Sequence, residues 1–212
     1  MPARPYGQFC GLAKSLDLVG ERWTLLIVRE LLDRPKRYGD LLGALAPIST
    51  DILASRLRDL EAAGLVVKTT PSPPATGRAY ELTEDGAALE PVVDAFVRWG
   101  RRLLEHRRPS EVVRPPWLAR AVRALVRPDR TGDLVVRLVA PEGGVTLRIT
   151  PGAVEDAEDT TTPDVVLTGD AEALARALDP TLVPDLLADG RLGVEGSPDD
   201  VRRLAALFAP GA

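Results

Sequence analysis

The chain has 212 residues, which suits one large domain or two small ones. No apolar run is long enough to span a membrane, one cysteine excludes an intramolecular disulfide, and one cysteine with one histidine supplies too few ligands for a structural zinc site. We therefore expect a cytoplasmic protein with no membrane partner and no cofactor. The net charge of -4 is unevenly distributed: residues 1–110 hold 16 Lys+Arg and 14 Asp+Glu, whereas the remainder holds 11 and 17, an asymmetry expected of two domains with different partners.

The first forty-five residues show the spacing of amphipathic helices. Apolar positions recur every three or four residues, which predicts helices over Phe9–Val19 and Glu21–Leu32. "DRPKR" is expected to be a loop, because Pro35 disfavours helical backbone at Arg34. A short helix is predicted to follow over Tyr38–Leu45.

The segment Ser49–Ala63, within "PISTDILASRLRDLEAAGLVVKTT", predicts a helix with two unlike sides. Ser49 is placed as the N-cap, with Ile48 and Leu53 able to pack together across it. Leucines at 53, 57 and 60 form one buried stripe. The opposite side carries small or hydrogen-bonding residues and one cation, namely Asp51, Ser55, Arg58 and Ala62. This open side of the helix could simply face solvent, or it could approach another surface closely.

A hairpin and a long helical stretch are predicted next. Val66–Thr70 and Arg78–Leu82 read as strands, joined by a turn at Pro71–Gly77. A helix is expected after Thr83 because two acids occupy its first turn. Pro91 either kinks that helix or starts a second one.

The order helix, turn, helix, hairpin is that of a winged helix, in which the second helix enters the major groove and the hairpin can follow the phosphate backbone or reach into the minor groove. The region from Phe9 to Leu104 resembles the HxlR-type family of bacterial transcriptional regulators. The resemblance lies in "LDLVGERWTLLIVRELLDRPKRYGDLL", "ISTDILASRLRDLEAAGLV" and "GRAYELTEDGAALEPVVDAFVRWG". It implies a dimer that binds double-stranded operator DNA, with Ser49–Ala63 as the recognition helix.

Candidate DNA contacts fall into two groups. Residues at the start and on the open side of the helix are expected near bases: Ser49, Thr50, Asp51, Ser55 and Arg58. Phosphate candidates are Arg34, Lys36, Arg37, Lys68 and Arg78, each of which could instead be an ordinary solvated charge. Arg56 lies nearer the buried stripe and is expected to hold a phosphate or an internal carboxylate. Asp51 departs from the basic or long polar residue common in the family, so this helix is expected to contribute modestly to affinity.

Two further features of the first half bear on assembly and regulation. Apolar residues outside the DNA-reading core supply either a dimer surface or intradomain packing: Phe9, Leu12, Leu16, Val92, Phe96, Trp99 and Leu103.

Cys10 is a candidate redox sensor. Lys14 lies one helical turn later and could lower the pKa of the Cys10 thiol. We favour the alternative that Cys10 is a small buried hydrophobe.

The second half changes from helical to alternating patterns. "RRPSEVVRPP" (Arg107–Pro116) reads as a linker. "DLVVRLVAPEGGVTLRIT" alternates as a hairpin, and two strand–turn–helix units follow in "PDVVLTGDAEALARALD" and "GRLGVEGSPDDVRRLAALF". Ser197 is a good N-cap, since Pro198 suits the first position of the last helix.

These segments, from about Asp133 to Phe208, resemble the sterol-carrier-protein-like domain. The resemblance implies a mixed sheet covered by helices around an apolar interior. Candidate cavity residues are Val136, Leu138, Leu147, Ile149, Val166, Leu174, Leu178, Leu182 and Leu186, which could equally form a filled core.

The fold class predicted is therefore α+β, with a winged helix-turn-helix domain at residues 1–106, a linker with a short helix at 107–132 and a sterol-carrier-like α/β domain at 133–212. We identify no catalytic set; His106 reads as an exposed helix end. The function predicted is a dimeric DNA-binding regulator that responds to an apolar small molecule. The alternatives are redox control through Cys10, or a lipid-binding or interaction protein whose winged helix does not bind DNA.

Overall fold

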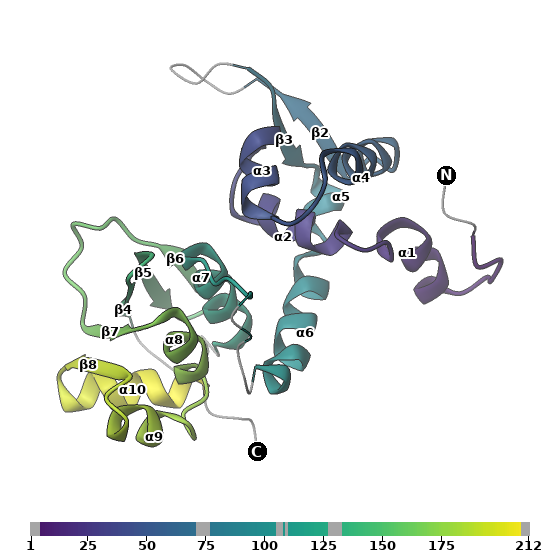
Figure 1. Ribbon diagram of the computed structural model, residues 1–212. Coiled ribbons are helices and arrows are strands. Elements are labelled where there is room, and N and C mark those ends of the chain that lie inside the picture. Colours follow the sequence, from purple (N-terminus) through teal and green to yellow (C-terminus); the bar gives the residue numbers. More distant parts are fainter. Residues whose placement is uncertain (1–4, 71–76, 105–107, 109, 127–132, 209–212) are drawn as a thin grey trace. The chain divides into compact units, whose positions relative to one another are not determined.

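A computed structural model describes residues 5–70, 77–104, 108, 110–126 and 133–208. The chain divides into two compact units, Met1–Val93 and Asp94–Ala212, and each is described by itself (Figure 1). The predicted hairpin turn, apart from Gly77, and His106 lie outside the described residues. In the described part, no helix is both long enough and apolar enough to cross a membrane.

The first unit contains the helices and hairpin expected of its sequence. Its elements are α1 (Gly11–Val19), α2 (Thr24–Asp33), β1 (Lys36–Arg37), α3 (Tyr38–Ala44), α4 (Thr50–Ala62), β2 (Val66–Thr69), β3 (Ala79–Leu82), α5 (Glu84–Ala87) and the start of α6 (Glu90–Gly100). Of the two alternatives for Pro91, the structure has a new helix, because α5 ends at Ala87 and α6 begins at Glu90.

The first unit has a three-stranded antiparallel sheet in the order β1-β3-β2. The expected loop "DRPKR" was wrong in part, since Lys36 and Arg37 form a short strand on the edge of β3. The proline keeps this backbone out of a helix, so its N–H and C=O groups are free to pair with a neighbouring strand. Buried Leu53, Leu57 and Leu60 of α4 join the hydrophobic core of this unit, as the stripe predicted.

The turn from α4 into the hairpin depends on Gly64. Its φ of +72° lies in the left-handed region, which glycine adopts without steric cost. The Gly64 N–H donates to the Glu61 carbonyl and the Leu65 N–H donates to the Leu60 carbonyl, each at 3.0 Å. This pair of bonds satisfies the last carbonyls of α4 and sends the chain directly into β2.

The second unit is a mixed sheet with helices against it. Its elements after α6 are η1 (Arg101–Leu103), α7 (Pro115–Leu125), β4 (Leu134–Ala140), β5 (Gly143–Thr150), β6 (Ala153–Asp156), β7 (Val165–Gly169), α8 (Ala171–Ala177), α9 (Val183–Ala188), β8 (Leu192–Gly196) and α10 (Pro198–Phe208). The strand order is β6-β5-β4-β7-β8, parallel only between β4 and β7. The predicted hairpin and both strand–turn–helix units are present, whereas β6 was not foreseen.

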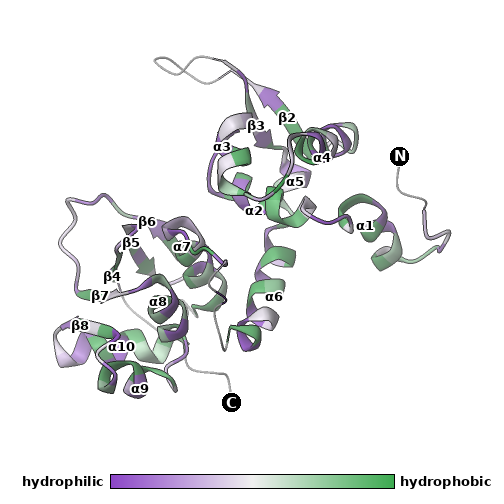
Figure 2. Ribbon diagram, viewed as in Figure 1, coloured by the Kyte–Doolittle hydropathy of each residue, from purple (hydrophilic) through white to green (hydrophobic). Residues whose placement is uncertain are grey.

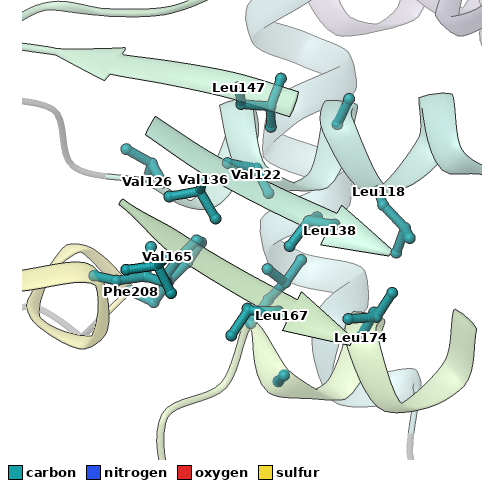
Figure 3. Close-up of a cluster of buried hydrophobic side chains, with 14 of the residues drawn as sticks. Leu118, Val122, Val126, Val136, Leu138, Leu147, Val165, Leu167, Leu174 and Phe208 are labelled. Atoms are coloured by element: carbon teal, nitrogen blue, oxygen red, sulfur yellow. The ribbon is translucent and has the colours of Figure 1, made fainter. Parts of the chain in front are cut away.

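The core of this unit lies between one face of the sheet and the helices (Figure 3). Leu118 and Val122, one turn apart on α7, pack with Val136 and Leu138 of β4. The predicted N-cap of α10 is confirmed, since the Asp200 N–H donates to the Ser197 hydroxyl at 3.1 Å.

Candidate nucleic-acid interface

The N-terminus of α4 is held by two side-chain hydrogen bonds. The Ser49 hydroxyl accepts from the Ile52 N–H at 3.3 Å, which is the predicted cap. The Tyr38 hydroxyl, at the start of α3, donates to the Thr50 carbonyl oxygen at 2.7 Å. The first bond caps α4 and the second joins it to α3, so both fix the end of α4 that would meet base edges.

The open side of α4 is accessible as predicted. Thr50, Asp51 and Arg58 are exposed, and Ser55 is half-buried. Since the leucine stripe on the other side is buried, α4 is packed with its small polar side outward. No carboxylate among the described residues lies within ion-pair distance of Arg58, so its guanidinium remains available to an external acceptor.

Of the two partners predicted for Arg56, a phosphate or an internal carboxylate, the structure shows the carboxylate. Its guanidinium lies 3.1 Å from the Asp59 carboxylate and 3.7 Å from that of Glu21, and its side chain is 19% exposed. Two nearby carboxylates compensate its charge, so Arg56 ties α4 to the segment before α2. Its charge is therefore used within the protein rather than toward DNA.

Most of the phosphate candidates are exposed. Arg34, Arg37 and Arg78 have exposed side chains. Lys68 on β2 is 37% exposed, and its ammonium lies 2.7 Å from Glu61. The hydrogen bond to Glu61 raises the pKa of Lys68, so this lysine stays charged. Its ammonium also lies 5.5 Å from the ring centroid of Tyr80.

Lys36 is the exception, and its assignment as a phosphate contact requires correction. Only 8% of it is exposed. Its ammonium is 2.9 Å from the Glu30 carboxylate and 3.4 Å from that of Asp33. Burial alone raises the pKa of Glu30, but bonds from Lys36 and Arg29 outweigh it and leave that pKa below its usual value. Lys36 is therefore a buried ion-pair partner that joins α2 to β1.

Two residues at this surface were missed by the sequence analysis. Tyr38 positions Thr50, but an aromatic residue near a helix start does not itself indicate such a bond. Ile52 is 43% exposed although it is apolar, because it lies between the leucine stripe and the open side of α4. An exposed isoleucine there can contact the methyl group of thymine.

The predicted dimer residues are exposed along two helix faces. On α1 and just before it, Phe9, Leu12 and Leu16 are 105%, 69% and 38% exposed. Along α6 and η1 the exposed residues recur three or four apart on one side, namely Val92, Phe96, Trp99 and Leu103. Figure 2 shows hydrophobic residues on both α1 and α6. We call these two sets the α1 stripe and the α6 stripe.

Cys10 is exposed, so the preferred interpretation of a buried hydrophobe was wrong. It is the N-cap residue of α1, where free N–H groups are not yet used by the helix. The backbone N–H groups of Ala13 and Leu12, at this helix start, lower the pKa of its thiol.

Most of the predicted cavity residues fill the core of the second unit. Buried there are Val136, Leu138, Leu147, Ile149, Leu174, Leu178 and Leu186. Val166 was assigned to the wrong face: Val165 and Leu167 point into the core, and side chains alternate along a strand. Leu182 is half-buried.

A different apolar pocket of about 150 Å³ lies beside this core. It is bounded by α10, β7, β8 and the segment from α8 to α9, and its lining includes Leu167, Val194, Leu204 and Phe208. None of the nine predicted cavity residues is among the described residues that line it. The sequence could not locate it, because a small void depends on how elements meet.

Comparisons with known proteins concern the first half of the chain. The HxlR-like helix-turn-helix family matches residues 18–108. An uncharacterised HTH-type transcriptional regulator, sll1512 of Synechocystis, is 34% identical over 104 residues, which cover 49% of this chain and 77% of that protein. The HTH-type transcriptional regulator YodB of Bacillus subtilis is 32% identical over 94 residues, 44% of this chain and 84% of YodB. A solved MarR-family regulator from Porphyromonas gingivalis is 31% identical, with a TM-score of 0.41, over 46% of this chain and 96% of its own.

Proposed function

Because the chain belongs to the HxlR-like helix-turn-helix family, we propose that this transcriptional regulator is a dimer that reads operator DNA with the Ser49–Ala63 segment. The observation that carries the proposal is the outward side of α4. It is exposed, small and hydrogen-bonding, and it includes Arg58, whose charge has no carboxylate partner among the described residues. A helix with such a side can enter the major groove without steric obstruction.

Base contacts are proposed for the open side of α4, and backbone contacts for the exposed cations around it. Thr50, Asp51, Ser55 and Arg58 offer donors and acceptors to base edges, with Ser49 capping the helix. Arg34, Arg37, Lys68 and Arg78 offer charge to phosphates. Phosphate contacts fix the register of a protein on the duplex but carry no sequence information directly.

The dimer is proposed to form through the α1 and α6 stripes. Isolated exposed apolar residues are normal on a monomer, but the α1 and α6 stripes together hold seven large ones, arranged along one face of each helix. Pairing two copies would bury it and present two recognition helices, so that a two-fold operator is read in two half-sites.

The second unit is proposed to bind an apolar small molecule in the pocket beside α10. Its volume of about 150 Å³ resembles that of an engineered apolar cavity that binds benzene. We also propose that residues 133–208 form a sterol-carrier-like domain. In this proposal residues 1–106 form the DNA-binding domain and residues 107–132 form the linker between the two domains. A ligand in the pocket alters DNA affinity only as far as it prefers one conformation.

Selection of bound duplexes from a random pool tests the DNA-binding function directly. We expect enrichment of a two-fold symmetric sequence, and affinity that falls steeply from about 50 to 200 mM salt. A pool that stays unenriched, with weak binding insensitive to salt, would favour the lipid-binding or interaction alternative.

Control by oxidation is a second candidate function, favoured by the exposure of Cys10 and the lowered pKa of its thiol. In this mechanism the thiolate attacks peroxide, one oxygen is transferred to give sulfenic acid, and the other leaves as hydroxide. Loss of operator binding after peroxide in the native chain, but not in Cys10→Ser, would support it. An equal response in both proteins would exclude it.

A further inference from the structure

The second unit contains a wide cleft that the proposed function does not use. Residues of α6, η1 and Leu104 form one wall, and residues from α8 to Leu182 form the other. Its volume is about 790 Å³, within the range of small-molecule sites. Among the described residues that line it, the charged ones are Arg98, Arg101, Arg102, Arg176 and Asp179. Four arginines thus face one carboxylate, although residues 94–212 carry 16 Lys+Arg and 19 Asp+Glu.

Two of these arginines are already engaged by the protein. The Arg101 guanidinium lies 2.5 Å from the Asp179 carboxylate. Burial by itself raises the pKa of Asp179, but hydrogen bonds from Thr181 and Arg101 outweigh it and lower that pKa, which keeps the carboxylate charged. Arg98 donates to the Ala124 carbonyl oxygen at 3.0 Å. The first contact joins the two walls of the cleft, and the second connects α6 to α7.

The other two retain unused hydrogen-bond donors. Arg102 is exposed, and its guanidinium carbon lies 4.5 Å from the Trp99 ring centroid. No carboxylate among the described residues is within ion-pair distance of it. Arg176 has a buried Nε without a hydrogen-bond partner in the described part of the chain. Its nearest carboxylate, Glu172, is 3.8 Å away and also pairs with Arg191 at 3.4 Å.

Because the Nε of Arg176 is buried, a ligand in the cleft would accept from the terminal N–H groups of that guanidinium, and such charge-assisted hydrogen bonds are stronger than neutral ones. The planar guanidinium matches the geometry of carboxylate and phosphate groups. Beside these donors the cleft has apolar surface at Trp99, Leu104 and Leu182. An arginine stacked on an indole ring also extends a flat surface against which a planar molecule can pack.

We propose that this cleft binds a small organic anion, whose carboxylate or phosphate is held by Arg102 and Arg176 and whose flat apolar body packs on Trp99, Leu104 and Leu182. The ligand differs in charge from the apolar molecule proposed for the pocket beside α10. The two sites share no lining residue among those described.

Calorimetric titration of the full chain with 2-naphthoate, and with its neutral analogue 2-naphthamide, tests the proposal. We expect saturable binding of 2-naphthoate, binding of the amide at least about tenfold weaker, and displacement of 2-naphthoate by excess inorganic phosphate. Arg102→Gln and Arg176→Met should each weaken 2-naphthoate about tenfold. Arg202→Gln, in an exposed arginine of α10, should leave affinity unchanged.

Arg102 is exposed, so Arg102→Gln is expected to fold normally, and the melting temperature of each variant checks this.

Equal affinity for acid and amide would overturn the proposal, as would 2-naphthoate binding that survives both arginine substitutions. Loss of DNA affinity in Arg102→Gln with unchanged 2-naphthoate binding would assign the cleft to nucleic acid instead. The titration contains no DNA, so its failure is distinguishable from failure of operator binding. Since Trp99 also belongs to the α6 stripe, titrations at several protein concentrations separate binding from dimerisation.

Discussion

The hydroxyl of Tyr38 donates a hydrogen bond to the backbone carbonyl oxygen of Thr50 at 2.7 Å. Tyr38 begins α3 and Thr50 begins α4, so one bond joins the two helices of the helix-turn-helix. In the proposed binding mode this bond lies where α4 enters the major groove, so it would set the direction from which that end of the helix approaches DNA.

Tyr38→Phe is therefore expected to weaken operator binding more than it destabilises the fold. A single hydrogen bond contributes about 0.5–1.5 kcal/mol to stability, and this one is exposed. Urea unfolding and DNA titration of the same preparation check the prediction. Unchanged operator affinity in the variant would mean that the bond does not position α4 for binding.

Arg58→Gln should lower affinity for the selected operator by about 1–3 kcal/mol and relax preference at one base position. The reason is that its exposed guanidinium has no carboxylate partner among the described residues. Titration against a set of single-base operator variants is the measurement. The matched control is Arg202→Gln, and a similar loss in both variants would argue for a general charge effect.

The buried pair of Lys36 and Glu30 is expected to stabilise the first unit rather than to bind DNA. Removing Lys36 leaves a buried carboxylate short of one partner, so Lys36→Met should cost roughly 3 kcal/mol in urea unfolding. Arg34→Met, at an exposed neighbour, should change stability by less than about 0.5 kcal/mol. Equal costs in the two variants would contradict the structural role of Lys36.

The same pair predicts a pH dependence of stability. The pKa of Glu30 is lowered in the folded protein, so its contribution is present above the ordinary glutamate value of about 4.3 and is lost as pH falls through the lower, folded value. Lys36→Met removes a bond that lowers this pKa, which should shift acid unfolding to higher pH. Far-ultraviolet circular dichroism during acid titration measures the shift, and Arg34→Met should show none.

Leu12→Glu and Phe96→Glu should each convert the proposed dimer into a folded monomer. Both leucine and phenylalanine side chains are exposed, at 69% and 57%, so the substitutions leave the cores intact. Light scattering over a range of concentrations gives the mass, and Leu187→Glu, at an apolar residue outside both stripes, is the control. A dimer that persists in both stripe variants would place the interface elsewhere.

The sequence by itself determined most elements of the chain and their order, although the short strands β1 and β6 were not foreseen. Local sequence predicts the helices, the cap at Ser49 and the two hairpin strands β2 and β3. The reason is that caps, turns and side-chain periodicity act over a few residues. The quoted motifs also led to the family. The face of α4 that is buried was predictable for the same reason, since leucines at 53, 57 and 60 lie on one side of any helix.

Only the tertiary structure decided which charges and cavities are available. Lys36 and Arg34 are both cationic and two residues apart, yet one is buried against Glu30 and the other is exposed. Val166 and Val165 are chemically identical, and strand register alone chose which of them faces the core. The arginine cleft joins residues more than seventy positions apart. Pairing partners, register and voids arise from contacts between distant segments, which no local pattern specifies.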